Sequence, residues 1–234
     1  DGDIDIISGN SAGDICLIRN LSGGAEPVWS TPELFRVGRK PFRIVAGKNG
    51  SIQGPAERKW GYTVLTVSDM DGDGRPDIVF NSIWGKVQWL RNKGSEDGLR
   101  MSRPKSVKVD WEGGTPKPEW NWWNPEEGTL VTQWRTTPAM IDWNGDGLDD
   151  LVCLDQEGYL SLYERIPGKV LFKPGKRVFF CGNCSSYNNM QGAVDSAPGL
   201  LRLNAGKAGS SGRRKICFAD WDGDGRKDLI VDSR

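Results

Sequence analysis

The chain has 234 residues, of which 37% are hydrophobic, so it is large enough for one or two packed domains and too apolar to be disordered. Its 31 basic and 31 acidic side chains cancel, which removes the overall field that would draw it to nucleic acid or to an anionic membrane. No run of about 18 apolar residues predicts a membrane span. The absence of histidine excludes an imidazole base and histidine-bound zinc within these residues.

One acidic phrase recurs along the chain. It reads DMDGDGRPDIVF, DWNGDGLDDLVCL and DWDGDGRKDLIV, and the copies begin at Asp69, Asp142 and Asp220, so their starts lie 73 and 78 residues apart. A truncated copy, DGDIDIIS, opens the chain and aligns Asp5 with Asp77. Because the chain starts inside a copy, we expect it to be a piece of a longer polypeptide, and the lack of a leader then says nothing about export.

Apolar segments rich in β-forming residues surround each copy. The first precedes the acidic loop (63–69, 137–143 and 215–221), and the second follows it (77–84, 150–156 and 228–233). A third comes after a turn (14–20, 86–92 and 159–165), and a weaker fourth comes next (33–38, 105–111 and 177–182). Since a propeller blade is a four-stranded antiparallel sheet, we expect an all-β propeller fragment of about three to four blades.

The blades and their insertions follow from this spacing. We expect a single partial propeller domain over 1–234, with blades at 1–44 (partial), 61–111, 135–181 and 213–234 (partial). The additional length lies between the fourth strand of one blade and the first strand of the next, in insertions at 45–60, 112–134 and 182–212. A closed ring needs about four to eight blades, which again indicates a fragment.

The acidic loops have the character of metal sites, because each carries oxygen-bearing side chains at positions one, three, five and nine. Hard oxygen ligands at alternate positions, with glycine at position six for the sharp turn and a carbonyl at position seven, fit Ca²⁺. The expected ligands are Asp69, Asp71, Asp73, the Arg75 carbonyl and Asp77; Asp142, Asn144, Asp146, the Leu148 carbonyl and Asp150; Asp220, Asp222, Asp224, the Arg226 carbonyl and Asp228; and, in the truncated copy, Asp1 and Asp5.

Two other kinds of loop were weighed against a calcium site of this type. An EF-hand is excluded, because position twelve holds Phe80, Cys153 and Val231 in place of a bidentate glutamate. A plain Asp-Gly hairpin turn with solvated charges is the alternative. Three near-identical copies favour the metal site.

The repeated pattern D-x-D/N-G-D-G-x-x-D, followed by an apolar strand at blade spacing, resembles the FG-GAP or VCBS repeat of integrin α-subunit propellers, fungal propeller lectins and secreted polysaccharide lyases. The resemblance implies a calcium-braced propeller, from a parent of about seven blades, that is secreted, displayed on the cell surface or periplasmic. It does not assign a function, because this scaffold serves adhesion proteins, lectins and lyases alike. Copies of this length are long for the family, which also indicates insertions.

The insertions are the candidate ligand-binding face. Because the acidic loops join strand one to strand two, the segments before each strand one lie on the opposite face of the disc, and loops on a rigid scaffold often carry binding groups. Indoles beside amides and basic groups can stack on and hydrogen-bond sugar rings. The alternatives are that the indoles only pack the insertions and that the basic groups are solvated. The candidate residues are Gln53, Arg58, Lys59, Trp60, Trp120, Trp122, Trp123, Trp134, Arg135, Arg213 and Arg214.

Three functions fit these features. The first is carbohydrate binding, with an acidic polysaccharide as partner, through the loops opposite the calcium sites. The second is a polysaccharide lyase, in which Arg135 or a basic pair neutralises a uronate carboxylate and Tyr62, Tyr187 or Lys59 removes the C5 proton. The third is integrin-like adhesion. Histidine, a common base in such lyases, is absent here, so a lyase needs another base or further blades.

Five cysteines complete the sequence features. Cys16, Cys153 and Cys217 lie in expected apolar strands, where a thiol behaves as a small buried hydrophobe. Cys181 and Cys184 form a lone C-x-x-C, for which a local disulfide in an exported protein is favoured over zinc.

Overall fold

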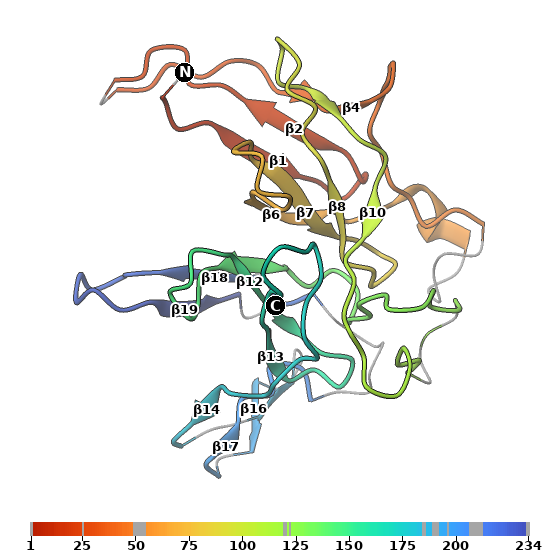
Figure 1. Ribbon diagram of the computed structural model, residues 1–234, viewed down its shortest axis with the longest axis vertical. Coiled ribbons are helices and arrows are strands. Elements are labelled where there is room, and N and C mark those ends of the chain that lie inside the picture. Colours follow the sequence, from red (N-terminus) through yellow and green to blue (C-terminus); the bar gives the residue numbers. More distant parts are fainter. Residues whose placement is uncertain are drawn as a thin grey trace.

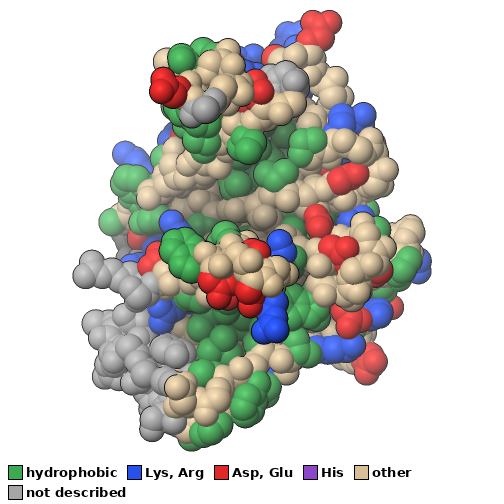
Figure 2. Space-filling view, turned by 90° about the vertical axis from the view of Figure 1, so that its left-hand side faces the viewer, with side chains coloured by type: hydrophobic (Ala, Val, Ile, Leu, Met, Phe, Trp, Pro, Cys, Tyr) green, Lys and Arg blue, Asp and Glu red, His purple; other side chains and the backbone are tan. Residues whose placement is uncertain are grey.

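The computed structural model describes residues 2–24, 26–48, 55–118, 121, 123–183, 186–188, 192–195, 197–205 and 213–232. Over these residues the fold is all-β, built from small sheets, with one short 3-10 helix, η1 (Pro55–Lys59), and no α-helix. A search of the same residues for a helix long and apolar enough to cross a membrane finds none. Basic and acidic side chains are interspersed on the face shown in Figure 2, as the cancelling charges lead one to expect.

Four antiparallel sheets correspond to the four copies. The first contains β1 (Ile6–Gly9), β2 (Ile15–Ile18) and β3 (Glu33–Leu34), and the second β6 (Val64–Ser68), β7 (Asp77–Asn81), β8 (Gln88–Leu90) and β10 (Lys105–Ser106). The third contains β11 (Ala139–Ile141), β12 (Asp150–Leu154) and β13 (Leu160–Tyr163), and the fourth β18 (Ile216–Ala219) and β19 (Asp228–Val231). Within each sheet, successive strands pair up and down, so the expected first three strands are confirmed wherever the chain includes them.

The expected fourth strands are only partly correct. Segment 105–111 contributes β10 to its sheet, as expected. Segment 33–38 is split between two sheets, because only β3 pairs in the first sheet. Strand β4 (Arg36–Val37) pairs antiparallel with β5 (Lys40–Pro41) and parallel with β9 (Arg100–Met101). Segment 177–182 does not extend the third sheet. Beside and just past β13, only isolated bridges from Leu162 to Lys176 and from Arg165 to Phe172 continue that sheet among the described residues. Strand β14 (Phe180–Cys181) pairs instead with β17 (Gly199–Leu200) of the insertion, beside the hairpin β15 (Ser186–Asn188) and β16 (Gly192–Asp195).

The sheets pack face against face in chain order, from the red strands β1 and β2 of Figure 1 through β6–β8 to β12 and the blue β18 and β19. The burial of strand β7 on both faces explains this stacking. Ile78 packs in the core shared with the first sheet, whereas Val79 packs in the core shared with the third. In β12, Leu151 faces the second sheet and Val152 the fourth. Successive side chains of one strand point to opposite faces of the sheet and therefore pack in two different cores.

The first strands of the sheets lie beside one another. Strand β6 contacts β1 and β11, and β11 contacts β18. The segments that lead into β6, β11 and β18 are thereby brought together at one end, beside the end of β1, and the acidic loops that follow β6, β11 and β18 lie at the other end. This arrangement places Tyr62, Arg135 and Arg213 at the opposite end of the first strands from the acidic loops.

The cysteines are distributed less uniformly than expected. Cys153 is fully buried, as predicted, but Cys16 is only half-buried and Cys217 is exposed. The prediction for Cys217 was wrong because, in the part of the chain that the structure describes, no further sheet covers its side of β18. Cys184 lies outside the described residues.

Candidate metal loops and candidate ligand pocket

The three complete acidic loops share one backbone arrangement. The position-one carboxylate accepts a hydrogen bond from the glycine amide at position six: Gly74 to Asp69 (2.8 Å), Gly147 to Asp142 (3.0 Å) and Gly225 to Asp220 (3.0 Å). The position-five carboxylate accepts one from the amide at position seven: Arg75 to Asp73 (3.0 Å), Leu148 to Asp146 (2.9 Å) and Arg226 to Asp224 (2.8 Å). Glycine is needed at position six, where φ is between 79° and 84°, a range that other residues adopt at a cost.

The position-nine aspartates close the loops at the start of each second strand. Asp77 is fully buried and accepts hydrogen bonds from the amides of Met70 (3.1 Å) and Asn92 (2.7 Å). Its burial raises the pKa of the carboxyl to about 6, and burial also raises the pKa of Asp150. In the truncated copy, Asp5 accepts a bond from Asn20 (2.9 Å), as Asp77 does from Asn92, which supports the alignment of the two copies.

The donor set fits a divalent cation. Asp69, Asp71 and Asp77 can each place a carboxylate oxygen within 4.8 Å of the others, and so can Asp220, Asp222 and Asp224. Oxygen Oδ1 of Asp71 is buried and has no hydrogen-bond partner among the described residues. A buried anionic oxygen without a partner is costly, and hard oxygen ligands suit Ca²⁺ or Mg²⁺. The residues therefore fit a metal ion without distinguishing calcium from other hard cations, and Asp1 lies outside the described residues.

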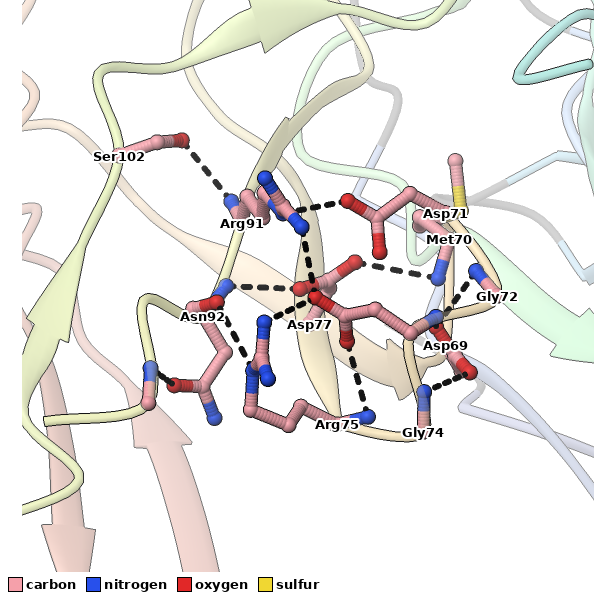
Figure 3. A network of polar contacts seen from close by, with 12 residues as sticks. Asp69, Met70, Asp71, Gly72, Gly74, Arg75, Asp77, Arg91, Asn92 and Ser102 are labelled. Carbon is pink, nitrogen blue, oxygen red and sulfur yellow. Dashed lines mark hydrogen bonds and ion pairs between the residues drawn. The ribbon is translucent and has the colours of Figure 1, made fainter.

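Loop 69–77 is braced by two arginines, whereas in loop 220–228 only the exposed Arg226, among the described arginines, lies near a loop carboxylate, 3.8 Å from Asp224. Arg91, which follows β8, pairs with Asp71 and with Asp73 (2.8 Å), and Arg75 also pairs with Asp73 (Figure 3). Although burial acts to raise it, hydrogen bonds from Arg91 and from the amide of Arg75 hold the pKa of Asp73 below its ordinary value. In loop 142–150 the equivalent of Arg91 is Glu164, which pairs instead with two lysines outside the loop.

A pocket of about 370 Å³ lies at the other end of the first strands. Its wall includes Asn10, Tyr62, Arg135, Arg213, Lys215 and Asp232. Tyr62, Arg135 and Arg213 each precede the first aspartate of their loop by seven residues (69, 142 and 220), so they hold the same position in three copies. All three residues were predicted singly from the sequence, and their equivalence was missed although the alignment of the copies contains it.

Tyr62 and Arg135 meet in an unusual conformation. Among the described residues they are the only ones besides glycine with φ in the left-handed region, at 52° and 61°. The guanidinium of Arg135 lies 3.5 Å from the centre of the Tyr62 ring. Glu57 of η1 joins both groups, because the Tyr62 hydroxyl donates to Oε1 (3.1 Å) and Arg135 Nη2 donates to Oε2 (2.6 Å). Left-handed residues of this kind cost about 1–3 kcal/mol each and cluster at functional sites.

The electrostatics of this pair bear on its chemistry. Burial and the hydrogen bond with Glu57 raise the pKa of Tyr62, and burial lowers the pKa of Arg135. The Tyr62 hydroxyl is therefore protonated at neutral pH and acts as a hydrogen-bond donor. The Nε of Arg135 is buried and has no hydrogen-bond partner in the described part of the chain, so the guanidinium retains donor capacity.

The other predicted ligand residues lie elsewhere. Arg58, Lys59 and Trp60 line a second hollow, and the Trp60 ring centre lies 6.2 Å from that of Tyr62 in the pocket. Trp123 is half-buried, donates to the Trp84 carbonyl (2.8 Å) and has the ammonium of Lys86 over its ring (4.1 Å).

Two predicted ligand residues serve the interior instead. Trp134 is buried, and Arg214 is buried with its guanidinium donating to the carbonyls of Leu203 (2.7 Å) and Asp232 (3.0 Å). Their burial gives both residues a structural role, and their role in ligand binding stays a prediction. Gln53, Trp120 and Trp122 lie outside the described residues.

Comparisons with known proteins do not identify the chain. No protein-family model matches it, and no curated protein sequence matches it. Its function is therefore inferred from the acidic loops and the pocket alone.

Proposed function

We propose that the chain is part of a calcium-braced β-propeller of the FG-GAP or VCBS kind that binds acidic polysaccharide in the pocket of Tyr62, Arg135 and Arg213. Support for the architecture comes from four up-and-down sheets stacked in chain order, one of them with four strands. Support for calcium comes from the repeated loop conformation and the oxygen donors that it gathers. Extracellular modules bind calcium with dissociation constants of about 10⁻⁴ to 10⁻³ M, so the proposal includes a secreted, cell-surface or periplasmic location.

The observation that carries the ligand proposal is the strained contact between Tyr62 and Arg135. Two left-handed residues at equivalent positions persist where function requires their side chains to meet, and here they present a phenol and a guanidinium to one pocket. Arg213 and Lys215 add positive charge to the wall. Guanidinium groups recognise carboxylate and sulfate through paired charge-assisted hydrogen bonds, which makes an anion the fitting ligand.

A polymer fits better than a small anion because a second hollow lies near the pocket. Trp60, with 43% of its surface exposed, lines that hollow together with Arg58 and Lys59, and its ring centre lies 6.2 Å from that of Tyr62 in the pocket. An indole face suits a sugar ring, and the neighbouring cations suit a further acid group along a chain. The calcium loops lie at the far end of the first strands, where a bound ion would stabilise the loops without touching the ligand.

The first test is binding of the 234-residue chain, in calcium, to polygalacturonate, alginate and chondroitin sulfate, measured by affinity electrophoresis and calorimetry. Replacing Arg213, which is exposed, with alanine should weaken binding about tenfold without loss of folding. Arg103→Ala removes an exposed arginine outside the pocket and is the matched control. Absence of binding to every acidic polysaccharide, or equal loss in both variants, would refute the proposal.

A lyase on the same scaffold is the second candidate, because Tyr62 and Arg135 share the pocket. In such a reaction Arg135 would pair with the uronate carboxylate, a phenolate would take the C5 proton, and the C4 oxygen would leave with the bonding electrons as a C4–C5 double bond forms. The raised pKa of Tyr62 opposes this role and favours binding. Growth of ultraviolet absorbance from unsaturated uronate during the binding assay would establish the lyase. No specific contact favours integrin-like adhesion.

A further inference from the structure

We propose that the carboxylate of Glu57 holds the place that a ligand carboxylate takes on Arg135 and Tyr62, so that the pocket selects uronates over sulfate esters and Glu57 limits their affinity. This inference rests on the proposed function and names the acid group that the site recognises. It concerns a residue that the sequence analysis did not select.

The geometry of the Glu57 contact is the geometry of carboxylate recognition. Each oxygen of the carboxylate serves one partner, Oε1 the Tyr62 hydroxyl and Oε2 the Arg135 guanidinium, at 3.1 Å and 2.6 Å. A uronate carboxylate has the same two oxygens in the same plane and can form the same two bonds. A sulfate ester presents tetrahedral oxygens, which match a phenol and a guanidinium held in this fixed relation less well.

Access to Arg135 depends on Glu57. The side chain of Arg135 is 5% exposed and is paired with Glu57, which is 15% exposed, while the Tyr62 ring centre lies 3.5 Å from the guanidinium. A ligand therefore reaches this group by replacing Glu57. The exchange of one carboxylate for another leaves the buried guanidinium paired throughout, which avoids the large cost of an isolated buried charge.

The position of Glu57 allows its side chain to move away from Arg135. It is carried on η1, a single short 3-10 helix, and its neighbours Arg58 and Lys59 line the adjacent hollow. A displaced Glu57 side chain can therefore turn toward other cations and solvent. Arg213 and Lys215, both exposed and without an ion pair among the described residues, remain on the wall to hold a second acid group of an oligomer.

The test compares the wild-type chain with Glu57→Gln and Glu57→Ala, by calorimetry in calcium, using oligogalacturonate as the carboxylated probe and a sulfated, uronate-free oligosaccharide of similar length. Glu127→Gln removes the same charge from an exposed site outside the pocket and is the control. Thermal melting of each variant verifies folding. We expect the Glu57 variants to bind oligogalacturonate about tenfold more tightly, because the internal competitor is gone, with a smaller change for the sulfated probe and none for Glu127→Gln.

Each other outcome has a distinct meaning. Weaker or unchanged oligogalacturonate binding by folded Glu57 variants, with binding by the wild type, would overturn the inference and make Glu57 a residue that positions Arg135. An equal gain for both probes would overturn the carboxylate selectivity. Failure of the wild type and of every variant to bind either probe would refute the proposed function itself, and this inference with it.

Discussion

Loops 69–77 and 142–150 have nearly the same sequence and the same internal hydrogen bonds, but they differ in what surrounds them. In the first, Arg91 and Arg75 neutralise the position-three and position-five carboxylates, whereas the second has Glu164 at the position of Arg91. The first is also covered by the following sheet, because Arg165 donates to the Asp69 carbonyl (3.2 Å). The difference teaches that the repeated phrase specifies the loop conformation, while the third strand and the neighbouring sheet determine its charge and burial.

The largest expected effect is on the free energy of unfolding, when the side chain at position two of a loop is truncated. Met70 is fully buried in the core between the second and third sheets, whereas Trp143 is 41% exposed. Met70→Ala should cost about 2–5 kcal/mol of unfolding free energy because it leaves a cavity, and Trp143→Ala about 1–2 kcal/mol because only part of the ring is packed. Urea unfolding in calcium measures both values. Equal losses would contradict the difference in burial between the two loops.

Removal of calcium comes next. At a calcium concentration about 100 times the dissociation constant, chelation should lower the unfolding free energy by about 2.7 kcal/mol for each occupied site. Loop 142–150 has no arginine to replace the ion, so the amides of Gly147 and Leu148 should lose more hydrogen-exchange protection than those of Gly74 and Arg75. Exchange measured by NMR in calcium and in chelator tests this order. Equal deprotection would show that the arginine brace has no such role.

A smaller effect is expected from exchanging the charges that distinguish the loops. Arg91→Glu should make loop 69–77 resemble its neighbour and tighten its calcium binding about two- to fivefold, because a competing cation is removed. Glu164→Arg should weaken calcium binding in loop 142–150 by a similar factor. Calorimetric titration of each variant gives the affinities. A change of the same sign in both would rule out competition between arginine and calcium.

The smallest effect is expected at the last loop, where Trp221 also holds position two but is 79% exposed. Trp221→Ser should change the unfolding free energy by less than about 0.5 kcal/mol, as for an ordinary surface position. Thermal melting beside Met70→Ala gives the comparison. A loss as large as that for Met70 would show that Trp221 is covered in solution.

The loops and the early strands could be predicted from sequence because their determinants are local. Continuous runs of apolar residues specify β7 and β12, and aspartates with glycine at fixed spacing specify the loop turns. The prediction of the weak fourth strands was only partly correct, because pairing depends on which partner strand lies near. Phe180 pairs with β17 of the insertion and not with β13.

The pocket was predictable in part. Tyr62, Arg135 and Arg213 were selected for their chemistry, but the contact of Arg135 with Glu57 joins residues far apart in the chain, and no local pattern reports it. Trp134 was assigned to ligand binding on residue type alone. Because an indole serves equally well in a core and at a binding surface, only the packing of the sheets shows which role it has.

The parallel pairing of β4 with β9 has a consequence for how the chain acquires its structure. Arg36 and Val37 align with Arg100 and Met101, so a segment that leaves the first sheet completes its bonds only after the second has been synthesised and ordered. Contacts between such distant residues slow folding and couple the units that they join. The first two sheets should therefore fold as one cooperative unit, seen as shared hydrogen-exchange kinetics. The two-stranded sheet of β18 and β19, which no such strand joins to its neighbour within the described part of the chain, should open independently.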